Sequence, residues 1–196
     1  RPGTDTFLLS SLPRLKPGLR VVDLGCGTGL LGLLLLQRQP ELRVTGVDIQ
    51  PEAIRLAEQA AAENGLQDRL AFHAADLRNV KALFPTGSFD LAVCNPPYYP
   101  SGSGALSADG ARRTARAEVS WPLEDVCAAA QYLLRWGGRL CLVHKPERLA
   151  DLLAAMRACA VEPKRLRFVQ LREGQAPSLV LAEGCRGGKP GLFVEA

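Results

Sequence analysis

The sequence Asn95-Pro96-Pro97-Tyr98 follows directly after the apolar run from Phe89 to Cys94 and could act on a flat amino group. The lone pair of such a group is delocalised into its π-system, so the nitrogen is a poor nucleophile. The Asn95 side-chain oxygen and the Pro96 carbonyl could accept its two N–H groups and favour a more tetrahedral nitrogen. Both prolines fix φ and lack an N–H, so the turn presents its carbonyls rigidly, and Tyr98 could stack on the ring. An isolated Asn-Pro-Pro is typical of an ordinary turn, so the surrounding elements must decide.

A glycine-rich loop supplies that context. The buried-strand pattern of residues 20–24 leads into Gly25-Cys26-Gly27-Thr28-Gly29 and then into an apolar helix pattern from Leu30 to Gln37. Such a loop allows a ligand to approach the backbone closely and directs free N–H groups at its polar end. Residues 27–32 also match G-x-G-x-x-G, which keeps an NAD-dependent reductase as an alternative.

Acidic residues follow three successive expected strands. Asp23 lies in the first, Asp48 ends the strand over residues 43–48, and Asp76 follows the strand over residues 69–74. We predict that Asp48 accepts the diol of a ribose and that Asp76 accepts the amino group of a cofactor adenine. One strand-end aspartate is typical of a helix cap or a turn, whereas three in succession favour a nucleoside-bearing cofactor.

The end of the chain distinguishes a dinucleotide-binding fold from other folds that bind a nucleoside-bearing cofactor. Residues 163–170 and 178–184 are strand-like and are joined by a stretch too short for a crossover helix, so we expect them to pair antiparallel. A dinucleotide-binding sheet would stay parallel. Five strand–helix repeats followed by a hairpin resemble the class I methyltransferases that use S-adenosylmethionine, and residues 23–29 resemble their first cofactor motif. The expected fold is α/β, a Rossmann-like three-layer sandwich with a mostly parallel seven-stranded sheet and a C-terminal antiparallel hairpin.

Composition indicates a single domain over residues 1–196, because 47% of the residues are hydrophobic and a chain of this length buries a sizeable core. No apolar run is long enough to span a membrane and no secretory signal opens the chain, so we expect a cytoplasmic protein. Six cysteines without C-x-x-C spacing and two histidines predict reduced thiols and no metal site. Cys94 allows a covalent-catalysis interpretation, but that would leave the Asn-Pro-Pro-Tyr motif without a role.

The positive charge is concentrated in the second half. Residues 1–98 carry 10 basic and 10 acidic side chains, whereas residues 99–196 carry 14 basic and 10 acidic, which accounts for the net charge of +4. Loops at the carboxyl ends of strands face the ligand, so a phosphate-bearing substrate would find partners there. The excess of arginine over lysine can equally reflect genome composition. The candidate RNA-binding residues are Arg112, Arg113, Arg116, Lys145, Arg148, Lys164, Arg165, Arg167 and Lys189, with Tyr99 beside the catalytic motif.

The stretches between these motifs predict further elements. Residues 100–120 lack apolar periodicity and are expected to form a lid that substrate orders. Residues 123–136 predict a helix ended by Gly137-Gly138, residues 139–143 the fifth strand, and residues 147–159 another helix. Trp121 and Trp136 are expected to be packing residues.

The second half also resembles the bacterial tRNA adenine-N6 methyltransferases that modify the purine next to the anticodon of a valine tRNA. The matching segments are residues 115–118, 144–149, 162–169 and 183–192. The resemblance implies S-adenosylmethionine as cofactor and tRNA as partner, with no membrane, no metal and a monomer or weak homodimer. It further implies that residues 4–7 help to close over the methionine end of the cofactor. The chain departs from the family at Ala117, where histidine is frequent, and N-terminal residues are expected to be missing. The implied catalytic residues are Asn95, Pro96, Pro97 and Tyr98, and the implied cofactor contacts are Asp5, Asp23, Gly25, Cys26, Gly27, Gly29, Asp48, Ile49, Asp76, Leu77 and Asn95.

The expected reaction is a direct displacement that needs neither a metal nor a strong general base. Three other enzymes remain alternatives: a protein glutamine-N5 methyltransferase, an rRNA guanine-N2 methyltransferase and an NAD-dependent reductase. A non-catalytic RNA-binding module that retains the fold is a fourth.

Overall fold

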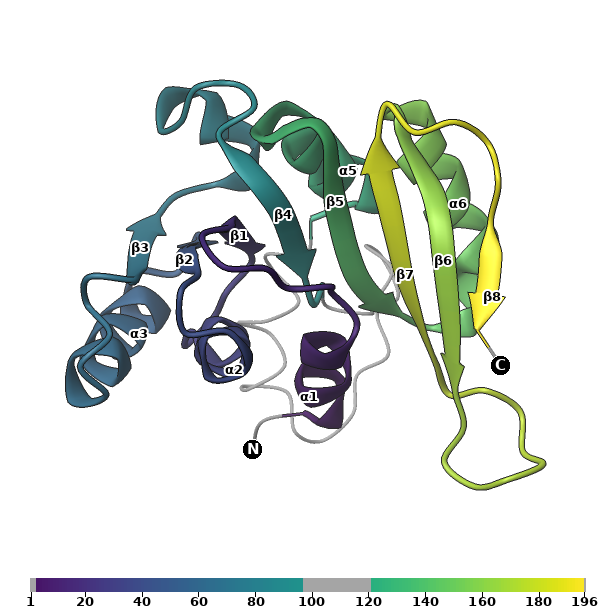
Figure 1. Cartoon of the computed structure of the whole chain (residues 1–196), viewed down its shortest axis with the longest axis horizontal. Helices are drawn as coiled ribbons and strands as arrows, with labels where there is room; N and C mark the ends of the chain where they lie inside the picture. The colour runs from purple at the N-terminus through teal and green to yellow at the C-terminus, as the bar shows by residue number, and fades with distance from the viewer. Residues whose placement is uncertain (1–2, 97–120, 196) are drawn as a thin grey trace, which may run out of the picture.

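The architecture is a mixed β-sheet with helices on both faces (Figure 1), and the computed structural model describes residues 3–96 and 121–195 of the chain. The chain alternates between strands and helices as far as α6 and then forms strands alone. The elements are α1 Thr4–Ser11, β1 Arg20–Leu24, α2 Leu30–Arg38, β2 Arg43–Asp48, α3 Pro51–Glu63, β3 Leu70–Ala74, the 3-10 helix η1 Leu77–Ala82, β4 Phe89–Cys94, α5 Leu123–Leu133, β5 Leu134–His144, the 3-10 helix η2 Pro146–Arg148, α6 Leu149–Ala158, β6 Val161–Val169, β7 Leu179–Arg186 and β8 Phe193–Glu195.

The strand order over the described residues is β3-β2-β1-β4-β5-β7-β6-β8. The first five strands run parallel, and β7 is antiparallel both to β5 and to β6. The predicted fold class and its closing hairpin are therefore confirmed. The sequence had predicted seven strands; the short strand β8, which pairs parallel with β6 at the sheet edge, is an addition.

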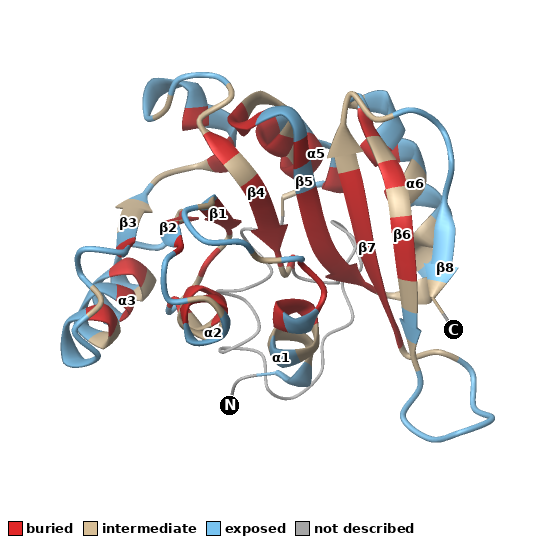
Figure 2. Cartoon of the chain, in the orientation of Figure 1, coloured by how far each residue is buried: buried red, intermediate tan, exposed pale blue. Residues whose placement is uncertain are grey.

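Two apolar layers cover the sheet because successive side chains of a buried strand point to opposite faces. Val21 and Val93 pack with α1 and α2, whereas Val22 and Ala92 pack with α5 and α6. Leu152 of α6 is completely buried. Figure 2 shows this burial along the central strands, with more exposed strands at the two edges.

One predicted boundary is wrong. The helix predicted to reach residue 136 ends at Leu133, and β5 begins at Leu134, so Gly137 and Gly138 lie inside a strand and do not cap a helix. A Cβ on Gly138 would lie 2.8 Å from the Arg135 carbonyl oxygen of the same strand and 3.2 Å from the Asp90 carbonyl oxygen of β4, so this irregular part of the β4–β5 pairing leaves no room for a side chain. Trp136 is 73% exposed, so its predicted role as a packing residue is wrong as well.

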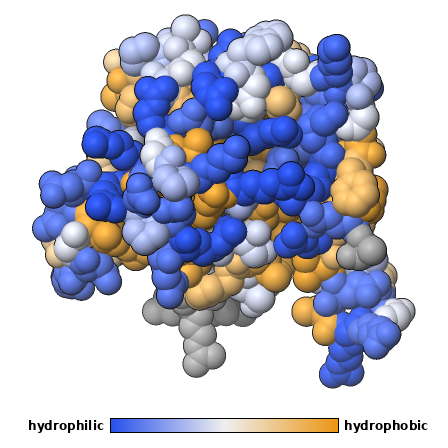
Figure 3. Space-filling view, in the orientation of Figure 1, coloured by the Kyte–Doolittle hydropathy of each residue, from blue (hydrophilic) through white to orange (hydrophobic). Residues whose placement is uncertain are grey.

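The surface is mostly hydrophilic on the face shown in Figure 3. Apolar atoms gather at the edge where β8 lies, and Phe193 of that strand is 63% exposed. Among the described residues, no helix combines the length and the apolar character needed to cross a membrane.

Candidate functional site

The candidate site lies where the sheet order changes direction. β2 and β4 flank β1 on opposite sides, and Asp23 of β1 is in register with Val93 of β4. Gly25 follows the last residue of β1, and Asn95 follows the last residue of β4. The glycine loop and the Asn-Pro motif therefore begin side by side. The carboxyl ends of parallel strands at such a switch point are where open α/β sheets bind their ligands.

The glycine loop is held open by backbone geometry that only glycine adopts readily. Gly25, Gly27 and Gly29 have φ values of 76°, 52° and 80°. The Gly25 N–H donates to the Val47 carbonyl at 2.8 Å, which ties the loop to β2. A Cβ on Gly27 would meet nothing within 4 Å, so the loop leaves open space where a ligand could contact the backbone.

Asp48 organises the end of β2. Its two carboxylate oxygens accept the backbone N–H groups of Gly27 at 2.8 Å and Gln50 at 3.0 Å. The carboxylate is thus fixed between the glycine loop and the start of α3, and each oxygen keeps a further lone pair for a ribose hydroxyl. Ile49, the next residue, is half-buried beside it.

Asp23 is a buried acid with unused hydrogen-bonding capacity. The residue is 2% exposed, and its Oδ2 has no hydrogen-bond partner among the described residues. Burial, and secondarily the charge of Asp48, raise the pKa of the Asp23 carboxyl to about 8. A carboxyl with an unpartnered oxygen beside an open glycine loop fits the cationic amino group of S-adenosylmethionine, because a positive charge would compensate the desolvated anion. The residues present therefore fit the cofactor predicted from the sequence.

Asp76 caps the start of η1, and its carboxylate already has hydrogen-bond partners within the protein. Its carboxylate accepts hydrogen bonds from Arg78, which lower the pKa of Asp76 to about 2. The Trp121 indole N–H also donates to Asp76 Oδ1 at 3.2 Å, and the same ring lies 3.3 Å from the position of a Cβ on Gly25. Trp121 packs on the core as predicted, yet it also spans the region between the predicted adenine contact and the glycine loop. Leu77, the next predicted contact, is buried.

Asn95 lies directly after β4 and is half-buried, and Pro96 is buried. The Asn95 side-chain Nδ2 donates to Thr6 Oγ1 at 3.0 Å, so helix α1 contacts the predicted catalytic motif across 89 positions of sequence. Asp5 of the same helix turn is half-buried. The remaining predicted residues of this region, Pro97, Tyr98, Tyr99, Arg112, Arg113 and Arg116, lie outside the described residues, as do Ala117 and the predicted lid over 100–120.

The cysteines are free thiols, as predicted, and four of the six are buried. Burial raises the pKa values of the Cys94 and Cys26 thiols well above their usual range. A thiol that stays protonated is a poor nucleophile, which argues against the covalent-catalysis interpretation of Cys94. Within residues 3–96 and 121–195, no cluster of three or more His, Cys, Asp or Glu side chains could hold a metal ion.

Among the predicted RNA-binding residues of the second half that the structure describes, several are engaged in contacts within the protein. Arg165 is 8% exposed, and its guanidinium donates to Glu183 at 2.7 Å and to the Leu12 carbonyl at 2.6 Å. Arg167 pairs with Glu195 at 2.5 Å. These contacts give the two arginines an internal structural role that the sequence did not indicate. Lys145 and Lys164 donate to the carbonyls of Ser178 and Lys189, at 3.5 Å and 3.0 Å, and Lys189 itself is exposed.

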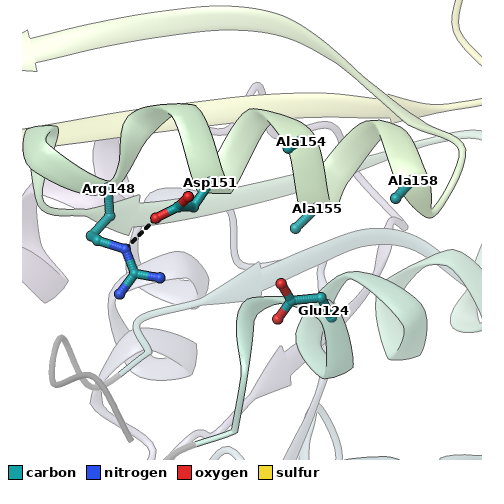
Figure 4. A pocket seen from close by; sticks show the side chains of 6 residues that line it. All are labelled: Glu124, Arg148, Asp151, Ala154, Ala155 and Ala158. Atoms are coloured by element: carbon teal, nitrogen blue, oxygen red, sulfur yellow. Dashed lines mark hydrogen bonds and ion pairs between the residues drawn. The ribbon is translucent and has the colours of Figure 1, made fainter.

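Arg148 lines a separate cavity of about 330 Å³ between α5 and α6. Its guanidinium is paired with Asp151 at 2.5 Å, and Glu124 faces the same cavity from α5 (Figure 4). Small alanine side chains of α6 form the rest of the lining. Because none of the predicted cofactor residues lines this cavity, it is distinct from the candidate site.

The sequence analysis did not assign a functional contact to two residues of the site, Thr6 and Trp121. Thr6 was included only as part of a segment resembling a family motif, and its contact with Asn95 joins distant parts of the chain. Trp121 was predicted to pack, and its indole N–H was not assigned a partner. The indole N–H of a buried tryptophan usually has a hydrogen-bond partner, and this regularity could have indicated a polar contact for Trp121.

Comparison with known proteins defines the class. A methyltransferase-domain family model matches residues 15–162. The crystal structure of a predicted O-methyltransferase from Agrobacterium tumefaciens superposes with a TM-score of 0.77 at 23% identity, covering 97% of this chain and 84% of that one. Geranyl diphosphate methyltransferase in complex with S-adenosylmethionine superposes with a TM-score of 0.66 at 20% identity, covering 92% and 83%. The fold is thus that of a class I methyltransferase.

Curated relatives identify the family. The tRNA1(Val) (adenine(37)-N6)-methyltransferase of Porphyromonas gingivalis is 35% identical over 190 residues, which cover 93% of this chain and 73% of the relative. The enzyme of the same name from Tolumonas auensis is 31% identical over 180 residues, covering 91% and 73%. The chain belongs to the tRNA1(Val) (adenine(37)-N6)-methyltransferase family and is a methyltransferase.

Proposed function

We propose that this protein transfers a methyl group from S-adenosylmethionine to the exocyclic N6 of adenine 37 in tRNA1(Val). The observation that carries the proposal is the position of Asn95 and Pro96 at the carboxyl end of β4, beside the glycine loop and beside Asp23, whose Oδ2 has no hydrogen-bond partner among the described residues. Membership of the family names the substrate, and the local geometry supplies the chemistry that such a substrate requires.

The cofactor is held by groups from three strand ends. Asp23 carries the charge complementary to the cofactor ammonium, and the open backbone of residues 25–29 accommodates the methionine portion. Asp48 would accept the ribose hydroxyl groups, and Asp76 would accept the adenine amino group once the Trp121 N–H no longer donates to it. When bound, S-adenosylmethionine supplies an electrophilic methyl group on a positively charged sulfur.

Asn95 and Pro96 then act on the target nitrogen. Their side-chain and backbone oxygens accept the two N–H groups of the adenine amine, which reduces conjugation of its lone pair with the ring and orients it for attack. The nitrogen forms the new N–C bond while the S–C bond breaks, and it then loses one proton to water. The attack moves the positive charge from sulfur to the nitrogen. The N-methylated cation is a strong acid because its lone pair returns to conjugation with the ring when the proton leaves, so water can accept that proton and a strong general base is unnecessary.

An anticodon-loop adenine suits this site because it is already unpaired. Moving it into a pocket costs about a few kcal/mol of unstacking, less than extraction from a duplex. No guanidinium of Arg165 or Arg167 is needed for this step, since both are committed to internal pairs.

The test is methyl transfer to an unmodified valine tRNA transcript carrying adenine 37, beside the same transcript with guanine at that position. Methylation of the first transcript alone, recovered as N6-methyladenosine, supports the proposal. Methylation of guanine at N2, of a protein glutamine amide, or of no substrate at all would assign the site to one of the alternatives.

A further inference from the structure

The Asn95 carboxamide is held by a residue of helix α1. Its Nδ2 donates to Thr6 Oγ1 at 3.0 Å. A carboxamide is planar and has one donor end and one accepting end, so fixing the nitrogen also fixes the direction of the oxygen. With the nitrogen directed at the Thr6 hydroxyl, Oδ1 points away from that hydroxyl.

This orientation matters because the two ends of the carboxamide have opposite effects on an amine. Oδ1 accepts a target N–H and helps to localise the nitrogen lone pair. A carboxamide rotated by half a turn would present its own N–H groups to the target N–H groups, and two donors repel. The proposed reaction therefore depends on which way Asn95 faces, and a neighbouring acceptor for Nδ2 settles that choice.

Helix α1 is attached firmly enough to serve as this reference. Leu9 and Leu12 at its far end are 0% and 1% exposed and lie in the core. The Arg165 guanidinium donates to the Leu12 carbonyl at 2.6 Å, and Arg38 donates to the carbonyls of Ser10 and Pro13. Two guanidinium groups from β6 and α2 thus bind the carbonyl end of the helix and its following turn. The opposite end, which carries Thr6, is held against the end of β4.

We propose that Thr6 is a positioning residue that sets the orientation of the catalytic Asn95 carboxamide through its hydroxyl oxygen. The inference rests on the proposed role of Asn95. Thr6 touches neither the methyl group nor the target nitrogen in this role, so its effect belongs to turnover and not to cofactor affinity.

The test compares Thr6→Val, which keeps the shape but removes the hydroxyl, with Thr6→Ser, which keeps the hydroxyl. Thr86→Val is the matched control, because the Thr86 hydroxyl also makes one hydrogen bond, to the Tyr132 carbonyl at 3.0 Å. Thr86 precedes the amino end of β4, whereas the candidate site lies at the carboxyl end of that strand. Each variant is assayed for kcat and KM with the valine tRNA transcript, for S-adenosylhomocysteine affinity by calorimetry, and for melting temperature.

Loss of one neutral hydrogen bond predicts that kcat of Thr6→Val falls about three- to tenfold. Cofactor affinity stays within about twofold, Thr6→Ser restores most of the turnover, and Thr86→Val keeps it. If Thr6→Val does not fold, Thr6→Ala replaces it in the same comparison.

Unchanged kcat in Thr6→Val, with Asn95→Ala inactive, would overturn the inference while leaving the proposed function in place. A loss of cofactor affinity in parallel with kcat would also overturn it, since Thr6 would then act in the cofactor site. Full activity of Asn95→Ala would remove the proposed role of Asn95 on which the inference rests, whereas absence of methyl transfer by the wild-type protein would remove the proposed function itself.

Discussion

Replacing Asp23 by asparagine removes the titration of a buried acid without changing its shape. In the folded, cofactor-free protein the pKa of Asp23 is about 8, compared with an ordinary value of 3.8. Below pH 4 the carboxyl is neutral in both the folded and the unfolded chain. Between pH 4 and 8 it ionises only when the chain unfolds, so the folded state binds one more proton and loses stability as the pH rises.

The size of the effect follows from the two pKa values. Each tenfold change corresponds to about 1.4 kcal/mol, so this group alone can lower the free energy of unfolding by roughly 5 kcal/mol between pH 4 and pH 8. Asparagine does not ionise, and its cost as a buried amide does not vary with pH. The stability of Asp23→Asn relative to the wild type should therefore increase steadily over this range.

Urea unfolding of the two cofactor-free proteins at intervals from pH 5 to pH 8 measures this difference. Asp68→Asn, which changes an exposed acid in the turn before β3, is the control and should follow the wild type. A difference between Asp23→Asn and wild type that stays constant with pH would refute the assignment of a buried, neutral Asp23.

Cofactor binding should reverse this preference, since an ammonium group favours the ionised acid. Binding of S-adenosylhomocysteine below pH 8 should release a proton, and affinity should fall up to about tenfold for each pH unit below 8. Calorimetry in two buffers of different ionisation enthalpy measures the released proton. Release of the same number of protons by Asp23→Asn would show that another group is responsible.

Three further predictions concern single side chains. Asn95→Ala should lower kcat by about 10²-fold or more while the affinity for S-adenosylhomocysteine stays within about twofold, because its oxygen acts on the target nitrogen; loss of cofactor binding would contradict this role. In a Trp136→Phe background, Trp121 is the one tryptophan left, and its emission should change when S-adenosylhomocysteine displaces its N–H from Asp76; unchanged emission at saturation would show that the indole does not move. Arg165→Met should lower the free energy of unfolding by about 3 kcal/mol, because the buried Glu183 loses the closer of its two arginine partners and keeps only Arg139 at 3.2 Å, and it should leave the salt dependence of tRNA binding unchanged; a salt slope reduced by about one would place Arg165 at a phosphate.

Local patterns were sufficient to predict where the glycine loop and the acidic residues at the strand ends lie in the fold. Positive φ values at Gly25, Gly27 and Gly29 are a backbone requirement that glycine spacing records directly. Parallel strands have their carboxyl ends on the same side of the sheet. The order of strands and helices along the chain therefore predicted that Asp23, Asp48 and Asn95 lie near one another. The antiparallel hairpin was predictable for a similar reason, since the connection between its strands is too short for a helix.

Contacts between distant residues were not predictable in the same way. The bond from Asn95 to Thr6 and the network that buries Arg165 depend on how α1 and β6 pack in three dimensions. Arg165 was assigned to RNA because charge was counted without its partners. The boundary at Leu133 was misplaced because paired glycines usually end helices, whereas here Gly138 permits close approach of backbones within β5.

Nucleoside analysis of tRNA after reaction with methyl-labelled S-adenosylmethionine tests the central claim most directly. Total tRNA lacking the modification, total protein and rRNA are incubated in parallel with wild-type protein and with Asn95→Ala. The account predicts that the label appears in tRNA as N6-methyladenosine with the wild type and falls about 10²-fold with the variant. Label in guanosine or in protein, or equal labelling by Asn95→Ala, would contradict it.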